Sequence, residues 1–303
     1  MSKRNLNKVQ KSAVESFGKP VLIFAGAGSG KTRVLTHKIA HLIDKDLVSA
    51  QNILAVTFTN KAAQEMRERV SKLLKNKNTS VNLGTFHSIC ARILRKEIHH
   101  LGYTADFSIF DVKDQVTLVK VVLEAMDIPK NYVTPQEVRH KISYFKNKLI
   151  HPDEAQSKAH LVIEKTYAEI YKNYQKALFE NNAVDFDDLL ILPLQLFEKN
   201  PKVLEKYRED WQYILVDEYQ DTNKPQFMLI KYLAGSHKQV CVVGDDDQSI
   251  YGWRGADIRN ILDFEKTFGN CEVFKLEKNY RSSGHILEAA SSVVKNNDNR
   301  APK

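Results

Sequence analysis

The sequence lacks the features that mark secreted, membrane-spanning or disulfide-rich proteins. Its 303 residues include only three cysteines, Cys90, Cys241 and Cys271, which are too widely spaced for a disulfide framework or a four-ligand zinc site. No apolar run approaches the roughly 18 residues of a membrane-spanning helix. The N-terminus also contains no apolar signal segment. We therefore expect a cytoplasmic protein that does not enter a membrane.

What the sequence does contain is typical of a globular protein with an uneven distribution of charge. Hydrophobic residues make up 43% and charged residues 27%, which excludes a disordered or low-complexity chain. Residues 1–104 carry 18 Lys/Arg against 6 Asp/Glu, whereas residues 105–184 carry 11 of each and residues 185–303 carry 16 against 20. The basic N-terminal third favours a polyanionic partner. Solvated surface lysines would explain the same charge about equally well.

Short β-branched or apolar runs alternate with helical periodicity over most of the chain. The runs that predict buried strands are 21–24, 53–58, 213–216, 240–243 and 273–276. Strands that alternate with helices indicate an α/β fold with a mainly parallel sheet flanked by helices. Residues 105–184 show helical periodicity alone, with turns at Pro129 and Pro152. This stretch predicts an all-α subdomain inserted into the α/β domain.

A glycine-rich loop, residues 25–32, lies between a predicted strand and a predicted helix. This context is that of a phosphate-binding loop, in which backbone N–H groups and a helix N-terminus bind phosphate oxygens. Lys31 would reach the β- and γ-phosphates, and the Thr32 hydroxyl would bind Mg²⁺. Ala25 replaces the usual first glycine, which is tolerable where φ is negative. The other expected phosphate contacts are Gly26, Ala27, Gly28, Ser29 and Gly30. The alternative is a glycine-rich turn without a ligand, which the flanking elements disfavour.

Acidic residues follow the predicted strand 213–216 directly. Asp217 would hold Mg²⁺, and Glu218 would orient or deprotonate the attacking water. Gln248 follows the strand 240–243 and is placed to sense the γ-phosphate or that water. An Asp–Glu pair after a strand is by itself more often a solvated loop or a helix cap. With a phosphate loop upstream, ATP hydrolysis becomes the favoured interpretation.

These motifs, in this order, resemble those of superfamily 1 DNA helicases of the UvrD/Rep/PcrA group. The matching segments are 6–14, 25–32, 56–63, 84–88, 216–223, 244–256 and 276–282. They extend over nearly the whole chain, so the resemblance is specific. It implies a RecA-like, P-loop NTPase motor domain at 1–104 and 185–277, an α-helical insertion at 105–184, and a stub of a second motor domain at 278–303.

The resemblance also implies roles at the nucleotide. Gln10 would read the adenine edge, and Tyr280 would stack on the adenine with help from Arg33. Arg281 would reach the γ-phosphate. Together with Lys31, Asp217, Glu218 and Gln248, Arg281 is expected to be catalytic.

For DNA, the resemblance points to a single-strand path lined largely by aromatic side chains, on which bases stack without sequence readout. The residues concerned are Phe58, Asn60, Phe86, His87, Tyr251, Trp253 and Arg254. For Phe58 and Phe86, a place in the core is the more probable interpretation from the sequence. Trp253 lies between Gly252 and Arg254 in a loop-like stretch and is the better candidate. Residues 185–190 also resemble the family, and we assign them a structural role.

The implied activity is ATP- and Mg²⁺-dependent translocation on single-stranded DNA, with 3′→5′ unwinding at junctions with duplex, in DNA repair or replication. Family members are about twice this length, so the sequence predicts a truncated N-terminal part with weak activity of its own. Two alternatives remain open. One is a non-catalytic fragment that binds ATP and single-stranded DNA, and the other is the motor part of a helicase–nuclease.

Overall fold

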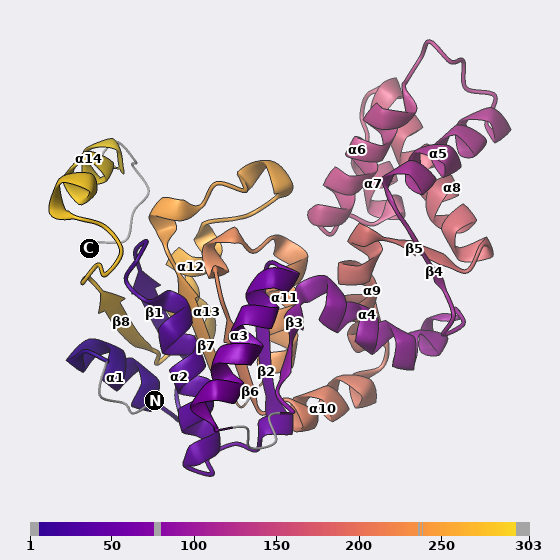
Figure 1. The fold of residues 1–303 in the computed structure, drawn as a ribbon. Coiled ribbons are helices and arrows are strands. Elements are labelled where there is room, and N and C mark those ends of the chain that lie inside the picture. Colours follow the sequence, from indigo (N-terminus) through magenta and orange to yellow (C-terminus); the bar gives the residue numbers. More distant parts are fainter. Residues whose placement is uncertain (1–5, 76–79, 236, 238, 295–303) are drawn as a thin grey trace. The chain divides into compact units, whose positions relative to one another are not determined.

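The computed structural model describes residues 6–75, 80–235, 237 and 239–294. The chain divides into two units, each with its own core (Figure 1). The sheet unit consists of Met1–Phe86, Leu204–Asn223 and Ile230–Lys303. The helical unit consists of His87–Val203 and Lys224–Leu229. It is therefore larger than the segment 105–184 that we expected to be inserted, and the domain boundaries given above stay a prediction.

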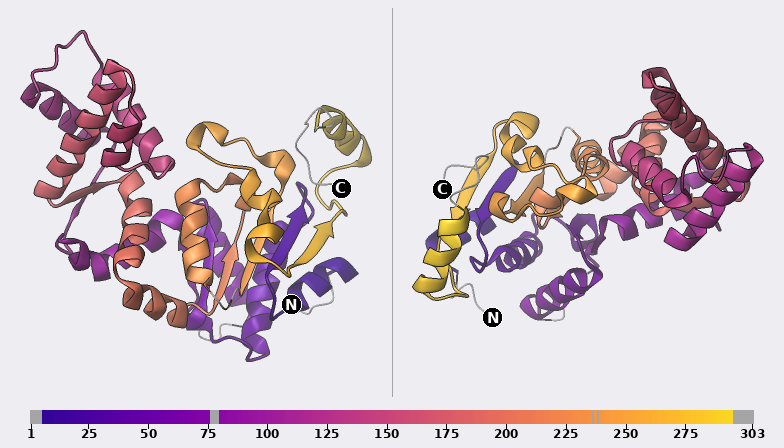
Figure 2. Two further views of the ribbon diagram at one scale, coloured as in Figure 1. Left: turned by 180° about the vertical axis from the view of Figure 1, so that it is seen from behind. Right: turned by 90° about the horizontal axis from the view of Figure 1, so that it is seen from above.

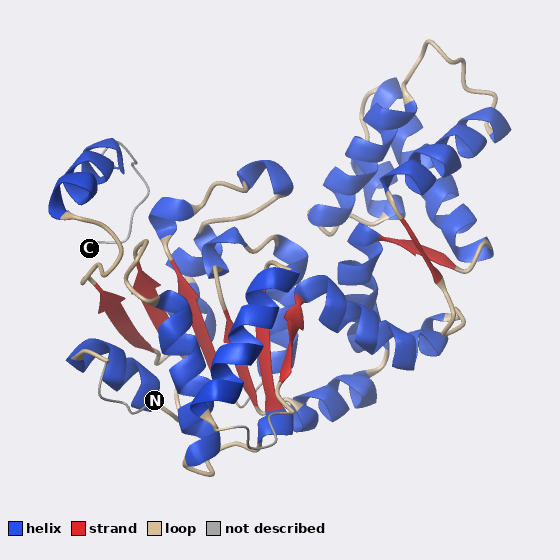
Figure 3. Ribbon diagram, viewed as in Figure 1, coloured by secondary structure: helices blue, strands red, loops and turns tan. Residues whose placement is uncertain are grey.

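A six-stranded parallel sheet forms the centre of the sheet unit (Figure 3). Its strands are β1 (Val21–Ala25), β2 (Ile53–Thr57), β3 (Asn82–Thr85), β6 (Tyr213–Val216), β7 (Val240–Gly244) and β8 (Glu272–Leu276). They lie in the order β3-β2-β6-β7-β1-β8. The central strands β1, β2, β6 and β7 are buried along their whole length, which is why they appear as unbroken apolar runs in the sequence.

Helices cover both faces of this sheet. In the view from above in Figure 2, the indigo and purple helices lie on one face and the orange segments on the other. The helices are α1 (Lys8–Glu15), α2 (Lys31–Asp44), α3 (Asn60–Leu73), α12 (Arg259–Leu262) and α13 (Phe264–Phe268). The helix α14 (Gly284–Val294) follows β8 and has no buried residue, so it does not cover the sheet. Two others, α10 (Pro201–Asp210) and α11 (Lys224–Ala234), cross the boundary between the units. The predicted α/β class with a flanked parallel sheet is confirmed.

The strand β3 was not predicted. Its sequence, Asn82-Leu83-Gly84-Thr85, contains one large apolar residue and a glycine, so it lacks the run that marks the other strands. β3 lies at the edge of the sheet and pairs only with β2 among the described strands, with Val56 opposite Gly84. An edge strand needs less apolar surface, which explains why periodicity did not reveal it.

The helical unit contains a bundle of helices and one short strand pair. Its helices are α4 (Phe86–Glu97), α5 (Val112–Ala125), α6 (Pro135–Asn147), α7 (Pro152–Lys158), α8 (Val162–Glu180) and α9 (Phe186–Lys199). The strands β4 (Ser108–Phe110) and β5 (Ala183–Asp185) pair in parallel, with Ile109 opposite Val184. The expectation of an all-α insertion was therefore wrong in this detail. Three residues are too few to show strand alternation, and the two halves of the pair are far apart in sequence.

Side-chain caps fix several helix starts. Asp111 and Asp114 form a capping box at α5, and Asp185 and Asp188 form another at α9. Single 3₁₀ turns occur at η2 (Ala50–Asn52), η3 (Ile98–Leu101), η4 (Tyr219–Asp221), η5 (Asp246–Gln248) and η6 (Gly252–Arg254). Within the described ranges, no helix combines the length and the apolar character needed to cross a membrane.

Candidate functional site

The phosphate loop connects β1 to α2 in the sheet unit. Gly28 and Gly30 have φ angles of 73° and 96°, a left-handed conformation that glycine adopts without steric cost. The Ser29 hydroxyl donates to the Gly26 carbonyl at 2.7 Å and closes the turn. Gly30 is the N-cap of α2 and provides no side-chain cap, so the N–H groups of the first turn point into the loop region. Ala25 ends the buried strand β1, where a methyl group is accommodated.

Side chains from three strand ends meet beside this loop. Lys31 follows β1, and its Nζ lies 3.1 Å from Glu218 Oε2 and 3.4 Å from Gln248 Oε1. Glu218 follows β6, and Gln248 follows β7. The carboxyl ends of parallel strands meet at one sheet edge, and this is why residues as far apart in sequence as Lys31 and Gln248, 217 positions, converge here. The structure thus brings together three of the predicted catalytic residues.

Asp217 is the buried carboxyl of the site. Burial, and then the neighbouring Glu218 charge, raise its pKa to about 7. The Thr32 side chain and the Glu218 N–H hydrogen-bond to Asp217, the latter at 3.0 Å. A divalent cation beside this carboxyl would relieve the burial of its charge, and carboxylate and hydroxyl oxygens are ligands that Mg²⁺ prefers. The residues present therefore fit the metal predicted for Thr32 and Asp217.

Glu218 has an unusual backbone conformation. Its φ of 49° and ψ of 44° lie in the left-handed region, which costs a non-glycine residue free energy and persists only where its surroundings impose it. The side chain, which is 37% exposed, is held by Lys31 and by the Gln220 Nε2, which donates to Glu218 Oε2 at 2.9 Å. A carboxylate held at one oxygen and still open to solvent is arranged to receive a proton from water.

The segment after β8 contacts the phosphate loop. The Tyr280 N–H donates to the Gly28 carbonyl at 2.9 Å, and Asn279 Nδ2 donates to the Ala27 carbonyl. A Cβ placed on Gly28 would lie 2.5 Å from the Arg281 Cβ, so only glycine fits there. The Asn7 side chain donates to the Tyr280 hydroxyl at 2.9 Å. These contacts place Tyr280 and Arg281 at the loop, and their roles at the adenine and the γ-phosphate stay predictions.

Gln10 and Arg33 also lie near the loop, in α1 and at the start of α2. Gln10 is 1% exposed, and its Nε2 donates to the Ser29 carbonyl at 2.9 Å. Its Oε1 accepts from the Asn7 N–H at 3.1 Å. In this structure the amide thus anchors the phosphate loop, and adenine recognition by Gln10 stays a prediction. Arg33 is half-buried, and its carbonyl accepts from the Thr36 hydroxyl and hydrogen-bonds to the His37 ring.

The aromatic candidates for DNA differ in their exposure. Trp253 is 75% exposed, with the Tyr251 ring 6.3 Å away between centroids. Phe86 is 2% exposed and lies 5.9 Å from the half-buried ring of Phe58. Trp253 therefore offers a stacking surface to a base, whereas the buried Phe86 ring packs against the ring of Phe58. Asn60 is exposed at the first turn of α3.

The remaining candidate, His87, belongs to the helical unit. Its ring lies 5.9 Å from the exposed Phe186, and burial lowers the pKa of the imidazole. Arg254 lies in η6 next to Trp253.

The family assignment follows from the motifs and this geometry together with a sequence comparison. A family model described as the UvrD/REP helicase N-terminal domain matches residues 6–269. The chain belongs to the UvrD/Rep helicase family. The resemblance inferred from the ordered motifs is thereby confirmed, as is the RecA-like class of the fold.

Curated relatives from this UvrD/Rep family extend the comparison. The chain is 49% identical over 298 residues to the ATP-dependent DNA helicase PcrA of Bacillus subtilis (strain 168), covering 98% of this chain and 40% of the relative. It is 50% identical over 299 residues to the protein of the same name from Staphylococcus aureus (strain NCTC 8325 / PS 47), covering 99% of this chain and 41% of that protein. The chain therefore spans about two fifths of the length of these relatives.

Two polar residues of the UvrD/Rep site were not assigned a role from the sequence. Gln220 is 1% exposed and connects two motifs, because its Nε2 holds Glu218 while its Oε1 accepts from the Asp245 N–H at 3.0 Å. Asn279 connects the phosphate loop to the Arg281 N–H. Both residues lie inside motifs that were identified from the sequence. The sequence does not show which group the amide of such a residue hydrogen-bonds to, because that depends on the folded structure.

Proposed function

We propose that this chain is the ATP-binding motor part of a DNA helicase that moves along single-stranded DNA with 3′→5′ polarity. One observation carries the proposal: Lys31, Glu218 and Gln248, from three different strand ends, meet within hydrogen-bond or ion-pair distance beside the phosphate loop. A structural ion pair does not require a glycine loop with left-handed Gly28 and Gly30 next to it. ATP hydrolysis by P-loop enzymes uses that combination.

The same contacts suggest how hydrolysis begins. Lys31 is paired with Glu218, so an entering triphosphate competes for the Lys31 ammonium and leaves Glu218 able to accept a proton from the attacking water. Thr32 and Asp217 are the residues that would hold Mg²⁺, which supplies charge stabilisation at the phosphates. Gln248, whose Nε2 donates to Asp245, is held beside Lys31 where the γ-phosphate would lie.

The proposed partners are single-stranded DNA and its junctions with duplex. The exposed Trp253 and the neighbouring Tyr251 supply a platform for stacking, and the basic residues of the first third supply attraction to phosphates. Gln220 gives a physical connection from Glu218 to Asp245, six residues before Tyr251 of the platform. We infer that this connection couples the state of the nucleotide to the DNA platform.

A steady-state ATPase assay with and without single-stranded DNA tests the proposal. We expect a slow ATPase that DNA stimulates, with turnover lost and ATP binding kept in Glu218→Gln. Glu205→Gln, which alters an exposed carboxylate paired with Arg208, is the matched control and is expected to leave turnover unchanged. Hydrolysis by Glu218→Gln at the parent rate would show that Glu218 does not have the proposed role.

The second candidate function is binding of nucleotide and DNA without efficient turnover. The observation that favours it is a close contact with the backbone of the phosphate loop, made by Asn279, Tyr280 and Arg281. This contact narrows the access of a nucleotide to the loop. On this alternative, ATP binding is measurable but DNA does not stimulate hydrolysis. We also expect no separation of a 3′-tailed duplex by this chain alone, and robust unwinding would contradict that expectation.

A further inference from the structure

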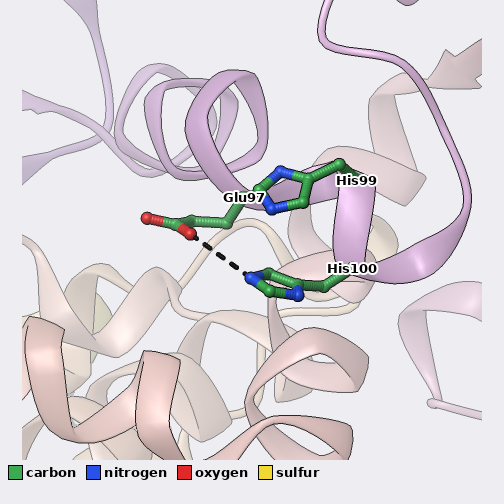
Figure 4. A group of neighbouring side chains, drawn as sticks. All are labelled: Glu97, His99 and His100. Atoms are coloured by element: carbon green, nitrogen blue, oxygen red, sulfur yellow. Dashed lines mark ion pairs between the residues drawn. The ribbon is translucent and has the colours of Figure 1, made fainter.

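Outside the nucleotide site, three potential metal ligands lie together at the end of α4 in the helical unit. Glu97 is the last residue of α4, and His99 and His100 belong to the 3₁₀ turn η3 that follows. Figure 4 shows the two imidazole rings and the carboxylate gathered on one side of this turn. One ligand atom from each of the three residues lies within 4.8 Å of the others. His100 Nε2 is 3.8 Å from Glu97 Oε2, and the two ring centroids are 4.1 Å apart.

The backbone that carries these side chains is firmly held. Ile98 and Leu94 are completely buried in one apolar cluster with Phe107. The turn closes at Gly102, which has a φ of 89° and whose N–H donates to the His99 carbonyl at 3.1 Å. A site built on a fixed turn loses little conformational entropy when a ligand binds.

The chemistry of the cluster is that of a transition-metal site. Imidazole nitrogens and a carboxylate oxygen are a usual ligand set for Zn²⁺, with bonds of about 2.0–2.2 Å. Around a tetrahedral ion such ligand atoms lie roughly 3.3–3.5 Å apart, so the present arrangement requires movements on the order of 1 Å. The two histidines are exposed and can make these movements by side-chain rotation, while Glu97, at 7% exposure, is the fixed anchor.

The charges around the cluster are of both signs, because Arg95 and Lys96 in the last turn of α4 are basic. The cluster lies at the C-terminal end of α4, where the backbone carbonyls contribute a partial negative charge. The neighbouring Arg95 is turned to other partners, since its guanidinium donates to the carbonyls of Ala105 and Phe107 and lies 3.8 Å from the centre of the Phe107 ring. The Glu97 carboxylate is the acidic group of the cluster, 3.8 Å from the His100 Nε2.

We propose that Glu97, His99 and His100 bind one divalent transition-metal ion of the Zn²⁺ class. Three protein ligands leave a fourth position for water or for a ligand from outside the cluster. Because the ion connects the end of α4 to η3, its binding stabilises the helical unit by mass action. This site is independent of the nucleotide site and of the activity proposed above.

Equilibrium dialysis of the purified, untagged chain against Zn²⁺ tests the proposal. We expect one bound equivalent and a higher midpoint of thermal unfolding in the presence of Zn²⁺. The double variant His99→Gln/His100→Gln is expected to bind at least tenfold more weakly and to lose the thermal shift. The matched control is His140→Gln/His160→Gln, which removes two exposed histidines of the same unit and is expected to bind as the parent does.

Glu97→Gln separates the anchor from the histidines and is expected to weaken binding as well. Since Glu97 is buried, circular dichroism must show that the Glu97→Gln variant is folded. If Glu97→Gln does not fold, the double variant His99→Gln/His100→Gln, which changes exposed residues, still tests the proposal. Equal Zn²⁺ binding by the parent and the double variant would overturn the proposal. So would a thiolate-to-metal charge-transfer band with Co²⁺, which would assign the ion to a cysteine such as Cys271.

Discussion

Each unit of the protein places a lysine next to carboxylates, and the two arrangements differ in their access to solvent. In the helical unit, Lys146 Nζ lies 2.7 Å from both Asp185 Oδ2 and Asp188 Oδ1, and all three side chains are at most 2% exposed. In the sheet unit, the Lys31 side chain is 10% exposed and its partner Glu218 is 37% exposed. The Lys146 group is therefore sealed from solvent, whereas the Lys31 group is open to solvent at the edge of a sheet.

The pKa values alone do not distinguish the two groups. Burial raises the pKa of Asp188 to about 7, and burial also raises the pKa of Asp217 to about 7. A perturbed carboxyl therefore identifies a functional site only together with its surroundings. Lys31 lies beside a glycine loop that can receive phosphate, whereas Lys146 has the Tyr174 ring nearby and shares Asp185 with the Tyr174 hydroxyl.

The largest expected effect is on stability in the sealed group. Lys146→Ala leaves Asp185 and Asp188 buried without their cation, which we expect to lower the free energy of unfolding by about 3–5 kcal/mol. Urea denaturation measures this change. Lys172→Ala, which breaks an exposed pair with Asp153, is the control and is expected to cost at most about 1 kcal/mol. Similar costs for the two variants would mean that the sealed group contributes no more than a surface pair.

In the open group the expected effect is on turnover and not on stability. Lys31→Ala removes the cation at the phosphates, and Asp217→Ala removes the carboxylate for the metal. Each is expected to lower the ATPase rate by about two orders of magnitude or more, equivalent to about 3 kcal/mol of barrier. Initial rates with saturating single-stranded DNA measure this. If Lys31→Ala instead destabilised the fold as Lys146→Ala does, the contrast between the two groups would disappear.

A third prediction concerns the exposed platform of the sheet unit. Trp253→Ala leaves the net charge unchanged and is expected to weaken single-strand binding by about 1–3 kcal/mol, because stacking on the indole is lost. The salt dependence, about −0.7 in log–log slope per phosphate neutralised, should change little. Fluorescence anisotropy at several salt concentrations measures both quantities.

Lys45→Glu changes the charge at an exposed position away from the motifs, and it is expected to have a much smaller effect than Trp253→Ala. Thermal unfolding must accompany both variants. Unchanged affinity in a folded Trp253→Ala protein would remove Trp253 from the DNA path and leave electrostatic attraction as the explanation.

The smallest expected effect is a slope of stability against pH. The raised pKa of Asp188 means that the folded state keeps a proton between about pH 4 and 7 that the unfolded state has released. The unfolded state then binds fewer protons, so this carboxyl makes stability fall as pH rises through that window, by at most about 1.4 kcal/mol per pH unit.

Asp188→Asn is expected to make the slope shallower by this contribution, whatever its effect on absolute stability, while Asp217, whose pKa is also about 7, keeps its own contribution. Asp153→Asn, at an exposed carboxylate, should leave it unchanged. Urea denaturation at several pH values between 4 and 7 compares the three proteins. The same slope in the parent and in Asp188→Asn would show that Asp188 is already ionised in the folded protein.

Parts of the fold and site that depend on short stretches of chain were predictable. The strands β1, β2, β6, β7 and β8 were predicted from their apolar runs, and the phosphate loop from its glycines between a strand and a helix. The expectation that 273–276 is buried was wrong, because β8 lies at the edge of the sheet and only Leu276 in it is buried. The strands β3, β4 and β5 were missed, because a short or edge strand gains its stability from a partner that the local sequence does not contain. Exposure at single positions was predicted for the buried Phe86 and the exposed Trp253, whereas Phe58, for which the sequence also favoured the core, is only half-buried.

The sequence by itself determined which chemical groups are present and in what order, and therefore the family. Glycine at positions 28 and 30 permits the left-handed backbone of the loop, and a lysine, two acids and a glutamine follow particular strands. Only the tertiary structure decided which groups meet. Lys31 reaches Glu218 and Gln248 because parallel strands end at one edge, and Lys146 is sealed because α6 and α9 pack its side chain away from water. Distances and access to solvent arise from packing between distant segments, and those are the quantities that separate a reactive carboxylate from a structural one.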